Sequence, residues 1–215
     1  MPITDKNTVD VYSQIMIDTK SEFKPKDHRN LDNVFLKIVK FSKGERIAIQ
    51  GIKDISIIPS ISQKLKDDNL IAIVSSEKKS ANEQSNYIKE YRIGDKFIPL
   101  LWNLDNITKL KDEQFHLIAL IGIEQLKKDP IAYLSSYLRL LKENGKLMII
   151  MEENSKNDLF LKKLLYEAEM GEMIGLLEKV GFSKRFFIKK VIDGDFKSIS
   201  ITTQKPKLNP LDYFQ

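Results

Sequence analysis

The chain has 215 residues, 42% of them hydrophobic and 30% charged, which is the composition of a globular protein with a substantial core. It contains no cysteine, which excludes disulfides, thiolate metal sites and cysteine nucleophiles. The net charge of +5 comes from 35 basic residues intermixed with 30 acidic ones, without a dense basic block, so nucleic acid is not the favoured partner.

Residues 1–29 are polar and irregular, and we expect them to form an N-terminal arm with a short helix around 9–17. The first residues lack the apolar core of a secretory signal, and no apolar run in the chain approaches the roughly 18 residues that span a bilayer. We therefore expect a cytoplasmic location and no membrane partner.

A regular pattern begins at residue 30, where apolar residues recur at helical spacing until Gly44. Residues 46–50 form a short apolar run that predicts the first buried strand, followed by a turn at Gly51 and a helix that ends near residue 66. Further apolar runs predict three more strands, with a polar helix between the first two of them, at 70–74, 97–102 and 115–121.

The next segment begins with a favourable helix start, Asp129 followed by Pro130. The helix that they open carries inward-facing apolar residues and is predicted to end at Asn144 and Gly145. A fifth strand is expected immediately afterwards, at 146–151.

The last part of the chain changes in kind. A helical region at 158–180 is expected to end at Gly181, and strands are expected at 182–192 and 197–203. They are joined by Asp-Gly-Asp at 193–195, which is typical of a hairpin turn.

This order of elements predicts an α/β fold with a seven-stranded mixed sheet and helices on both faces. Five strands are expected to be parallel, and the last two to form a C-terminal antiparallel hairpin. We expect one domain over residues 30–206, preceded by the arm at 1–29 and followed by a loose tail at 207–215.

Four segments carry motifs with a characteristic spacing. Residues 141–150 run Leu-Lys-Glu-Asn-Gly-Lys-Leu-Met-Ile-Ile, and residues 176–182 run Leu-Leu-Glu-Lys-Val-Gly-Phe. Residues 203–206 run Thr-Gln-Lys-Pro, and residues 105–116 run Asp-Asn-Ile-Thr-Lys-Leu-Lys-Asp-Glu-Gln-Phe-His. In these motifs the chain resembles the class I S-adenosylmethionine-dependent methyltransferases, a family with a Rossmann-like sheet.

The resemblance implies S-adenosylmethionine as cofactor, bound where the parallel strands end at their carboxyl edge. The matching positions make these residues the candidate cofactor-binding set: Gln50, Gly51, Ser75, Ser76, Glu77, Asp105 and Gly122. Asp105 is the strongest single candidate, because it stands where the family has an acid that contacts adenine. An acid at this position can also serve only as a helix cap.

The first loop departs from the family pattern Asp-X-Gly-X-Gly-X-Gly. Gly51 remains, but Lys53 and Ile55 fill the next two glycine positions. Ser75 stands where the family has a ribose-binding acid at the end of the second strand, unless Glu77 takes that role. Each lost ribose bond or clashing side chain weakens cofactor affinity by about 1–3 kcal/mol.

Two functions remain open from the sequence. One is a methyltransferase acting on a small molecule, since methyl transfer needs positioning more than a catalytic triad. The other is a catalytically silent binding or scaffold subunit that works with a partner protein or as a homo-oligomer. RNA modification is a less favoured third class.

Other chemically notable residues favour ordinary structural roles. His28 and His116 lie far apart and form no metal-binding pattern, and His116 is expected at the core or a sheet edge. We expect Trp102 to pack in the core and Glu152 and Glu153 to lie in a solvated loop. The sequence contains no zinc, Walker or nucleophile motif, so no catalytic residue is assigned.

Overall fold

The computed structural model describes residues 16–18, 31–122, 124, 126–152, 170–193 and 196–207. Its strands are β1 (Met16–Asp18), β2 (Arg46–Gln50), β3 (Leu70–Ser75), β4 (Phe97–Leu101), β5 (Phe115–Ile121), β6 (Leu141–Glu152), β7 (Phe187–Asp193) and β8 (Phe196–Gln204). Its helices are α1 (Leu31–Ile38), the 3-10 turn η2 (Ile55–Ile57), α2 (Ile58–Lys64), α3 (Lys78–Glu90), α4 (Leu104–Ile107), α5 (Pro130–Leu140) and α7 (Met170–Val180).

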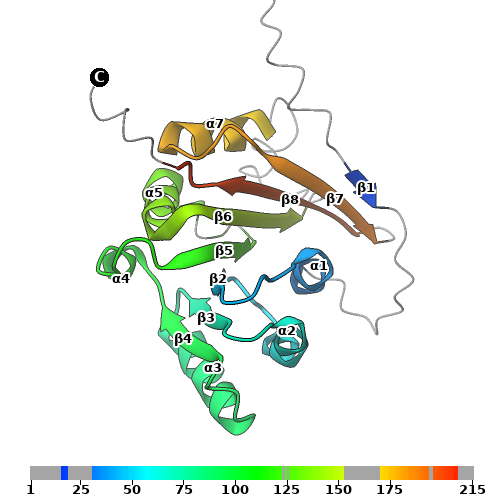
Figure 1. The fold of residues 1–215 in the computed structure, drawn as a ribbon, viewed down its shortest axis with the longest axis vertical. Helices are drawn as coiled ribbons and strands as arrows, with labels where there is room; N and C mark the ends of the chain where they lie inside the picture. The colour runs from blue at the N-terminus through cyan, green and yellow to red at the C-terminus, as the bar shows by residue number, and fades with distance from the viewer. Residues whose placement is uncertain are drawn as a thin grey trace, which may run out of the picture.

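All of these strands form one sheet in the order β1-β7-β8-β6-β5-β2-β3-β4 (Figure 1). Strands β2 to β6 pair in parallel, and β8 runs antiparallel to both β6 and β7. The predicted seven-stranded mixed sheet with its C-terminal hairpin is therefore confirmed. Strands β5 and β2 are neighbours, but the chain continues from β2 to β3 on one side and from β5 to β6 on the other. This reversal creates a switch point at the carboxyl edge of β2 and β5.

An eighth strand, β1, extends the sheet beyond the predicted seven. It pairs in parallel with β7, which otherwise presents an edge of unpaired backbone groups. Met16 and Ile17 therefore belong to a strand, and the predicted helix over 9–17 is wrong at its end; the rest of that prediction lies outside the described residues.

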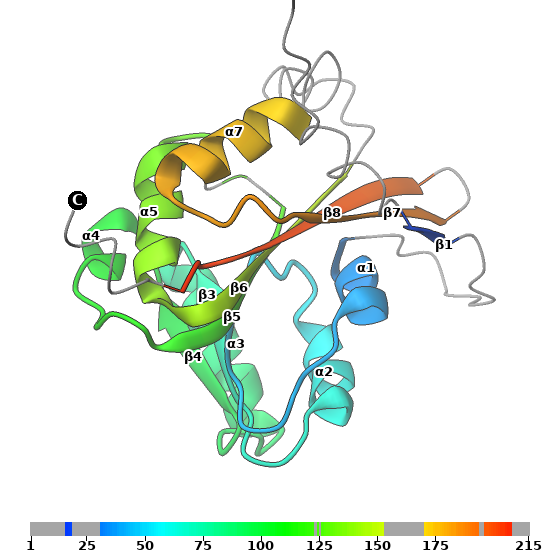
Figure 2. The ribbon, with the colours of Figure 1, turned by 45° about the horizontal axis from the view of Figure 1, so that its top comes forward.

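Helices cover both faces of the sheet (Figure 2). Alternate residues of each strand point to opposite faces, so Ile47 and Ile49 of β2 join the core beneath α1, α2 and α3. Ala48, between them, joins the core beneath α4, α5 and α7. Buried strands that meet apolar side chains on both faces explain the almost continuously apolar runs in the sequence.

Local residues explain several helix boundaries, and those predicted at Asp129 and Gly181 are confirmed. Asp54 caps η2 by accepting from Ser56 N at 2.9 Å, and Pro59 lies in the first turn of α2. Asp129 caps α5 by accepting from Ala132 N at 2.9 Å. Gly181 follows the end of α7, while residues 158–169 of the predicted helix lie outside the described part of the chain.

Three boundaries differ from the predictions. Helix α1 ends at Ile38 rather than at Gly44. Helix α5 ends at Leu140, and β6 begins at once, because Asn144 and Gly145 pair with Lys205 rather than closing a helix. The backbone N–H of Asn144 donates to Lys205 O at 3.2 Å, and the backbone N–H of Lys205 donates to Gly145 O at 2.8 Å. Strand β7 begins at Phe187 rather than at residue 182.

Among the described helices, none combines the length and the apolar character needed to cross a bilayer.

Candidate functional site at the carboxyl edge

The candidate residues from the sequence meet at one edge of the sheet. Gln50 ends β2 and Ser75 ends β3, while Gly122 follows β5 and Asp105 follows β4. These four strands are consecutive neighbours and parallel, so the residues after them come out on the same side.

Gly51 is required by the close approach of β2 and β5. Its φ of +92° belongs to the left-handed region, and a Cβ there would lie 2.1 Å from the carbonyl oxygen of Ile121. Gly122, at φ +84°, turns the chain after β5 and donates its N–H to Ile150 O at 2.8 Å. The switch point therefore keeps two glycine turns side by side.

The loop after Gly51 is held by a residue that the sequence does not indicate, Asp32 of α1. Its Oδ2 accepts from the backbone N–H of Asp54 at 2.8 Å and of Lys53 at 3.1 Å. Asp32 is 1% exposed. A buried carboxylate thus satisfies two N–H groups in the loop where the family has its glycines.

The large side chains at the lost glycine positions are accommodated within the fold. Ile52 and Ile55 are partly buried and pack against the core beneath α1 to α3, whereas Lys53 is exposed. Core packing on that face explains why the loop tolerates isoleucine at position 55.

Burial of Asp32 has a consequence for stability. Desolvation raises the pKa of its carboxyl above the usual value, although the bonds from Asp54 and Lys53 oppose that shift. The folded state therefore binds this proton more tightly than the unfolded state, so the contribution of Asp32 to stability falls as pH rises from about 4 through the folded-state pKa. We expect the free energy of unfolding of the wild type, measured relative to Asp32→Asn by urea titration, to increase as the pH is lowered over this range. An unchanged difference between the two proteins would contradict the raised pKa.

Gln50 faces α5 rather than the loop. Its Oε1 accepts from the hydroxyl of Tyr137 at 2.8 Å, and both residues are buried. The Nε2 of Gln50 has no hydrogen-bond partner among the described residues. Gln50 therefore ties β2 to α5 at the candidate site.

At the end of β3, Ser75 is buried and its carbonyl accepts from Trp102 N at 2.8 Å. Ser76 and Glu77 follow and are exposed. Glu77 immediately precedes α3, but its side chain makes no capping bond to the helix. Its carboxylate is therefore not needed to begin α3.

Asp105 is exposed in the first turn of α4. The cap of that helix is Asn103, whose side chain accepts from Asn106 N at 3.0 Å. The alternative in which Asp105 serves only as the cap is therefore wrong, and its carboxylate is not needed to begin the helix.

Aromatic side chains lie beside this edge. Trp102 is 1% exposed, meets Phe115 edge-on at 5.5 Å between ring centroids, and lies 6.4 Å from the ring of Tyr137, as the predicted core packing requires.

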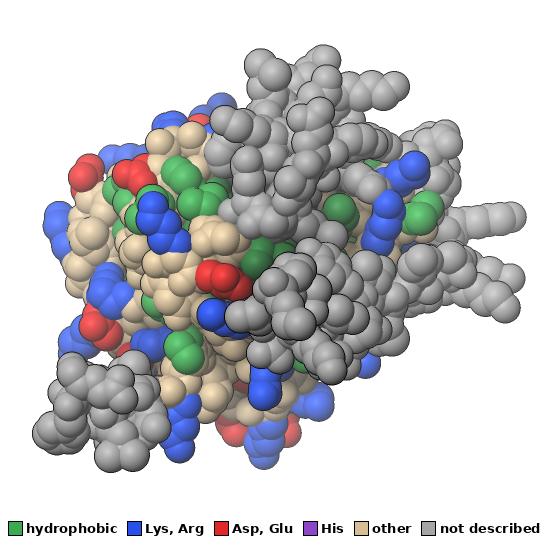
Figure 3. All heavy atoms as spheres, turned by 90° about the horizontal axis from the view of Figure 1, so that it is seen from above, with side chains coloured by type: hydrophobic (Ala, Val, Ile, Leu, Met, Phe, Trp, Pro, Cys, Tyr) green, Lys and Arg blue, Asp and Glu red, His purple; other side chains and the backbone are tan. Residues whose placement is uncertain are grey.

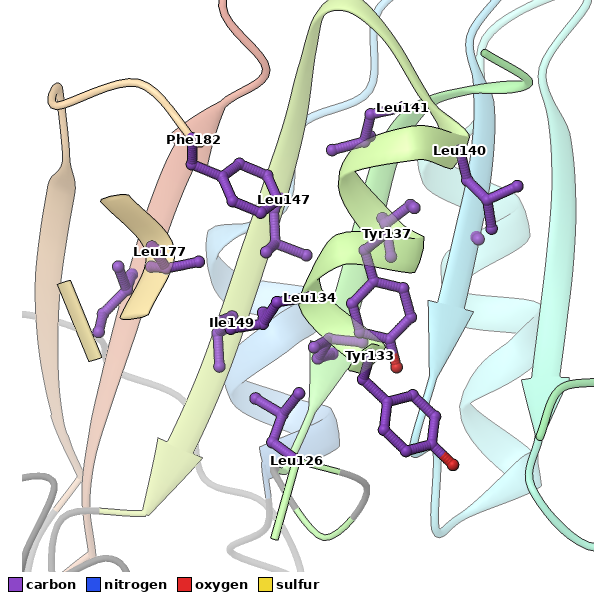
Figure 4. Close-up of a cluster of buried hydrophobic side chains, with 14 of the residues drawn as sticks. Leu126, Tyr133, Leu134, Tyr137, Leu140, Leu141, Leu147, Ile149, Leu177 and Phe182 are labelled. Carbon is purple, nitrogen blue, oxygen red and sulfur yellow. The ribbon is translucent and has the colours of Figure 1, made fainter. Parts of the chain in front are cut away.

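Tyr133 and Tyr137 project from α5 with their hydroxyls toward the end of the sheet at which β6 ends (Figure 4). Burial raises the pKa of Tyr133, and the charges of Asp105 and Asp129 raise it further. Its hydroxyl therefore stays protonated at neutral pH.

The remaining candidates have structural positions. The Nδ1 of His116 accepts from Arg46 N at 2.9 Å at the amino ends of β5 and β2, so it lies at the opposite edge from the site. Glu152 is exposed at the end of β6; Glu153 and His28 lie outside the described residues. Within the described ranges, no group of three histidine or acidic side chains is arranged to hold a metal ion.

Several solved structures have a fold similar to that of this chain. A SAM-dependent methyltransferase from Aquifex aeolicus aligns over 80% of this chain and 88% of its own, with a TM-score of 0.61 and 15% identity. A Haloferax volcanii protein solved in complex with the Trm112 methyltransferase activator aligns over 81% of this chain and 88% of its own, with a TM-score of 0.64 and 11% identity. The chain has the fold of the class I S-adenosylmethionine-dependent methyltransferases.

This methyltransferase fold is shared with a protein of another named activity. The [4+2]-cyclase SpnF aligns over 82% of this chain and 80% of its own, with a TM-score of 0.61 and 11% identity. No protein-family model and no curated sequence matches the chain. The methyltransferase likeness therefore concerns the fold alone, and the site has to be judged from its residues.

Proposed function

We propose that this chain binds S-adenosylmethionine at the carboxyl edge of β2 to β5 and transfers its methyl group to a small molecule. The observation that carries the proposal is the pair of glycine turns at the switch point. Any residue with a Cβ would clash at position 51. Gly122 forms the turn that follows the neighbouring strand, β5. These turns lie in a sheet connected as in the methyltransferases.

We propose a role for each of the residues at this edge in holding the cofactor. Gly51 would lie beneath the methionine part, and Glu77 or Ser75 would hold the ribose hydroxyls. Asp105 would accept from the adenine, and Gly122 would offer its carbonyl oxygen, since its N–H is bonded to Ile150. When bound, the cofactor supplies an activated methyl group. The protein's own task is then to orient the two reactants and exclude water.

The charge on the described part of one face favours a small-molecule acceptor over a nucleic acid. In the view of Figure 3, the Lys and Arg side chains of the described residues are spread among acidic and apolar ones. A basic stripe of the kind that follows a nucleic acid backbone is not visible on the described part of that face.

Binding calorimetry with S-adenosylmethionine and S-adenosylhomocysteine tests the proposal. We expect binding in the micromolar range, and Asp105→Ala should weaken it about tenfold to a hundredfold, the effect of losing one charged hydrogen bond. Asp95→Ala is the matched control, because Asp95 is an exposed acid in the turn before β4, at the other edge of the sheet. Absence of heat at millimolar ligand, or equal effects of the two variants, would refute the proposed site.

The second candidate is a silent binding subunit, and one observation favours it. The N–H groups of Lys53 and Asp54 are already bonded to Asp32, so this loop offers fewer donors to a ligand. This candidate predicts no response to either ligand together with stable self-association, or association with a partner protein, in light scattering. A monomer that binds the cofactor would exclude it.

A further inference from the structure

Asp32 is a buried charged residue that the proposed function does not use. It lies in the first turn of α1, which is anchored in the core by Val34 and Phe35, at 3% and 0% exposure. Its carboxylate crosses to a loop 21 and 22 residues further along the chain. Helix α1 therefore places the negative charge of Asp32 next to residues 52–54, which we call the cofactor loop.

The carboxylate and the loop conformation depend on each other. A buried carboxylate is tolerated only when donors satisfy it, and the two backbone N–H groups of the loop are the donors here. If the loop moved away, both the carboxylate and the two N–H groups would lose their partners. Asp32 should therefore hold residues 52–54 in a single conformation.

The charges around Asp32 come from the loop itself. Asp54 and Lys53 are the charged neighbours that act on its carboxyl group, with opposite signs. Lys53 is exposed, so its charge is screened by solvent, and Asp54 caps η2. The buried side of the loop therefore keeps the negative charge of Asp32.

We propose that Asp32 is the positioning residue of the cofactor loop and that its charge makes the site prefer a ligand that is positive near this loop. The charge preference rests on the proposed function, because it assumes that the ligand lies over Gly51. S-adenosylmethionine carries a positive sulfonium, whereas the sulfur of S-adenosylhomocysteine is neutral. If the sulfur lay about 8 Å from this charge, at an effective dielectric constant of about 20, the ratio of their affinities would change by a factor of about thirty.

Hydrogen exchange tests the positioning role without any ligand. Asp32→Asn keeps the shape of the side chain but replaces the charged acceptor of both loop N–H groups with a neutral amide oxygen, which accepts weaker bonds. In this variant the peptide covering residues 51–57 should exchange at least about tenfold faster than in the wild type. Peptides from β5 and α5 should be unchanged, and Asp95→Asn should leave the loop unchanged. Equal exchange of the loop in wild type and Asp32→Asn would overturn the proposal.

Chemical rescue provides a second measurement of the same role. Asp32→Ala should lower the thermal midpoint, and about 100 mM sodium formate should raise it by several degrees, because formate replaces the missing carboxylate. The wild type and Asp95→Ala should show no more than the effect of sodium chloride at equal ionic strength. Equal shifts in all three proteins would contradict the role; if Asp32→Ala does not fold, the exchange measurement on Asp32→Asn decides.

The charge preference is tested by an affinity ratio. A merely structural role would weaken both ligands by the same factor in Asp32→Asn. The proposal instead predicts that the preference for S-adenosylmethionine over S-adenosylhomocysteine falls about tenfold to thirtyfold. An unchanged ratio would overturn the charge preference. If neither ligand binds the wild type, the proposed function and the charge preference fail together, while the exchange and rescue measurements still decide the positioning role.

Discussion

Gly51→Ala is expected to destabilise the protein by at least about 3 kcal/mol, because two costs add at this residue. The backbone has a φ of +92°, which disfavours any side chain, and the new Cβ would lie 2.1 Å from the carbonyl oxygen of Ile121. Strands β2 and β5 would have to separate at the centre of the sheet. Urea unfolding followed by the fluorescence of Trp102, the single tryptophan in the chain and fully buried, measures this loss.

Gly175→Ala is the matched control for this substitution. Gly175 lies within α7, and a Cβ there would meet no atom within 4 Å. Alanine should stabilise the helix by about 0.5–1 kcal/mol, because it is a better helix former than glycine. A Gly51→Ala protein as stable as the wild type would show that β2 and β5 do not approach as closely as described.

Arg139→Met is expected to cost about 2–3 kcal/mol, since it keeps the length of the side chain but removes its hydrogen bonds. The guanidinium of Arg139, in the last turn of α5, donates to Leu110 O at 2.6 Å and to Ile107 O at 2.7 Å, and also binds Asp112. These carbonyls belong to the end of α4 and the segment after it. Arg139 therefore fastens α4, which carries Asp105, to α5.

The control for Arg139→Met is Asp112→Asn, which removes only the ion pair. The Asp112 side chain is 65% exposed, so this change should cost less than about 1 kcal/mol. Because α4 would be less firmly held, Arg139→Met should also weaken S-adenosylmethionine binding, measured by calorimetry at a temperature where both proteins are folded. Comparable stability losses in the two variants would show that the carbonyl bonds contribute little.

Much of the fold follows from local sequence patterns. The first five predicted strands are short apolar runs between helices, and the last two flank the hairpin turn at 193–195. Turn chemistry at Asp129, Pro130 and Gly181 locates helix ends that the structure confirms. The start of β6 does not follow from such patterns, because Asn144 and Gly145 pair with Lys205, about sixty residues away. Strand β1 likewise depends on a distant edge, that of β7.

The candidate site, like the fold, can be predicted from the sequence only in part. Sequence position alone brings the residues after β2 to β5 to one edge, since parallel strands share their carboxyl ends. The sequence does not indicate the role of Asp32, because its bond to the loop spans more than twenty residues and leaves no periodic pattern. A polar residue within the apolar face of α1, between Leu31 and Val34, is the one local indication that it is buried.

The most direct test of the proposed site is a crystal structure of the protein with S-adenosylhomocysteine. We predict that the ligand lies across the carboxyl edge, with its homocysteine part over Gly51 and its adenine beside Asp105. A saturated crystal without ligand at this edge, or with the ligand bound elsewhere on the molecule, would contradict a cofactor site in this fold.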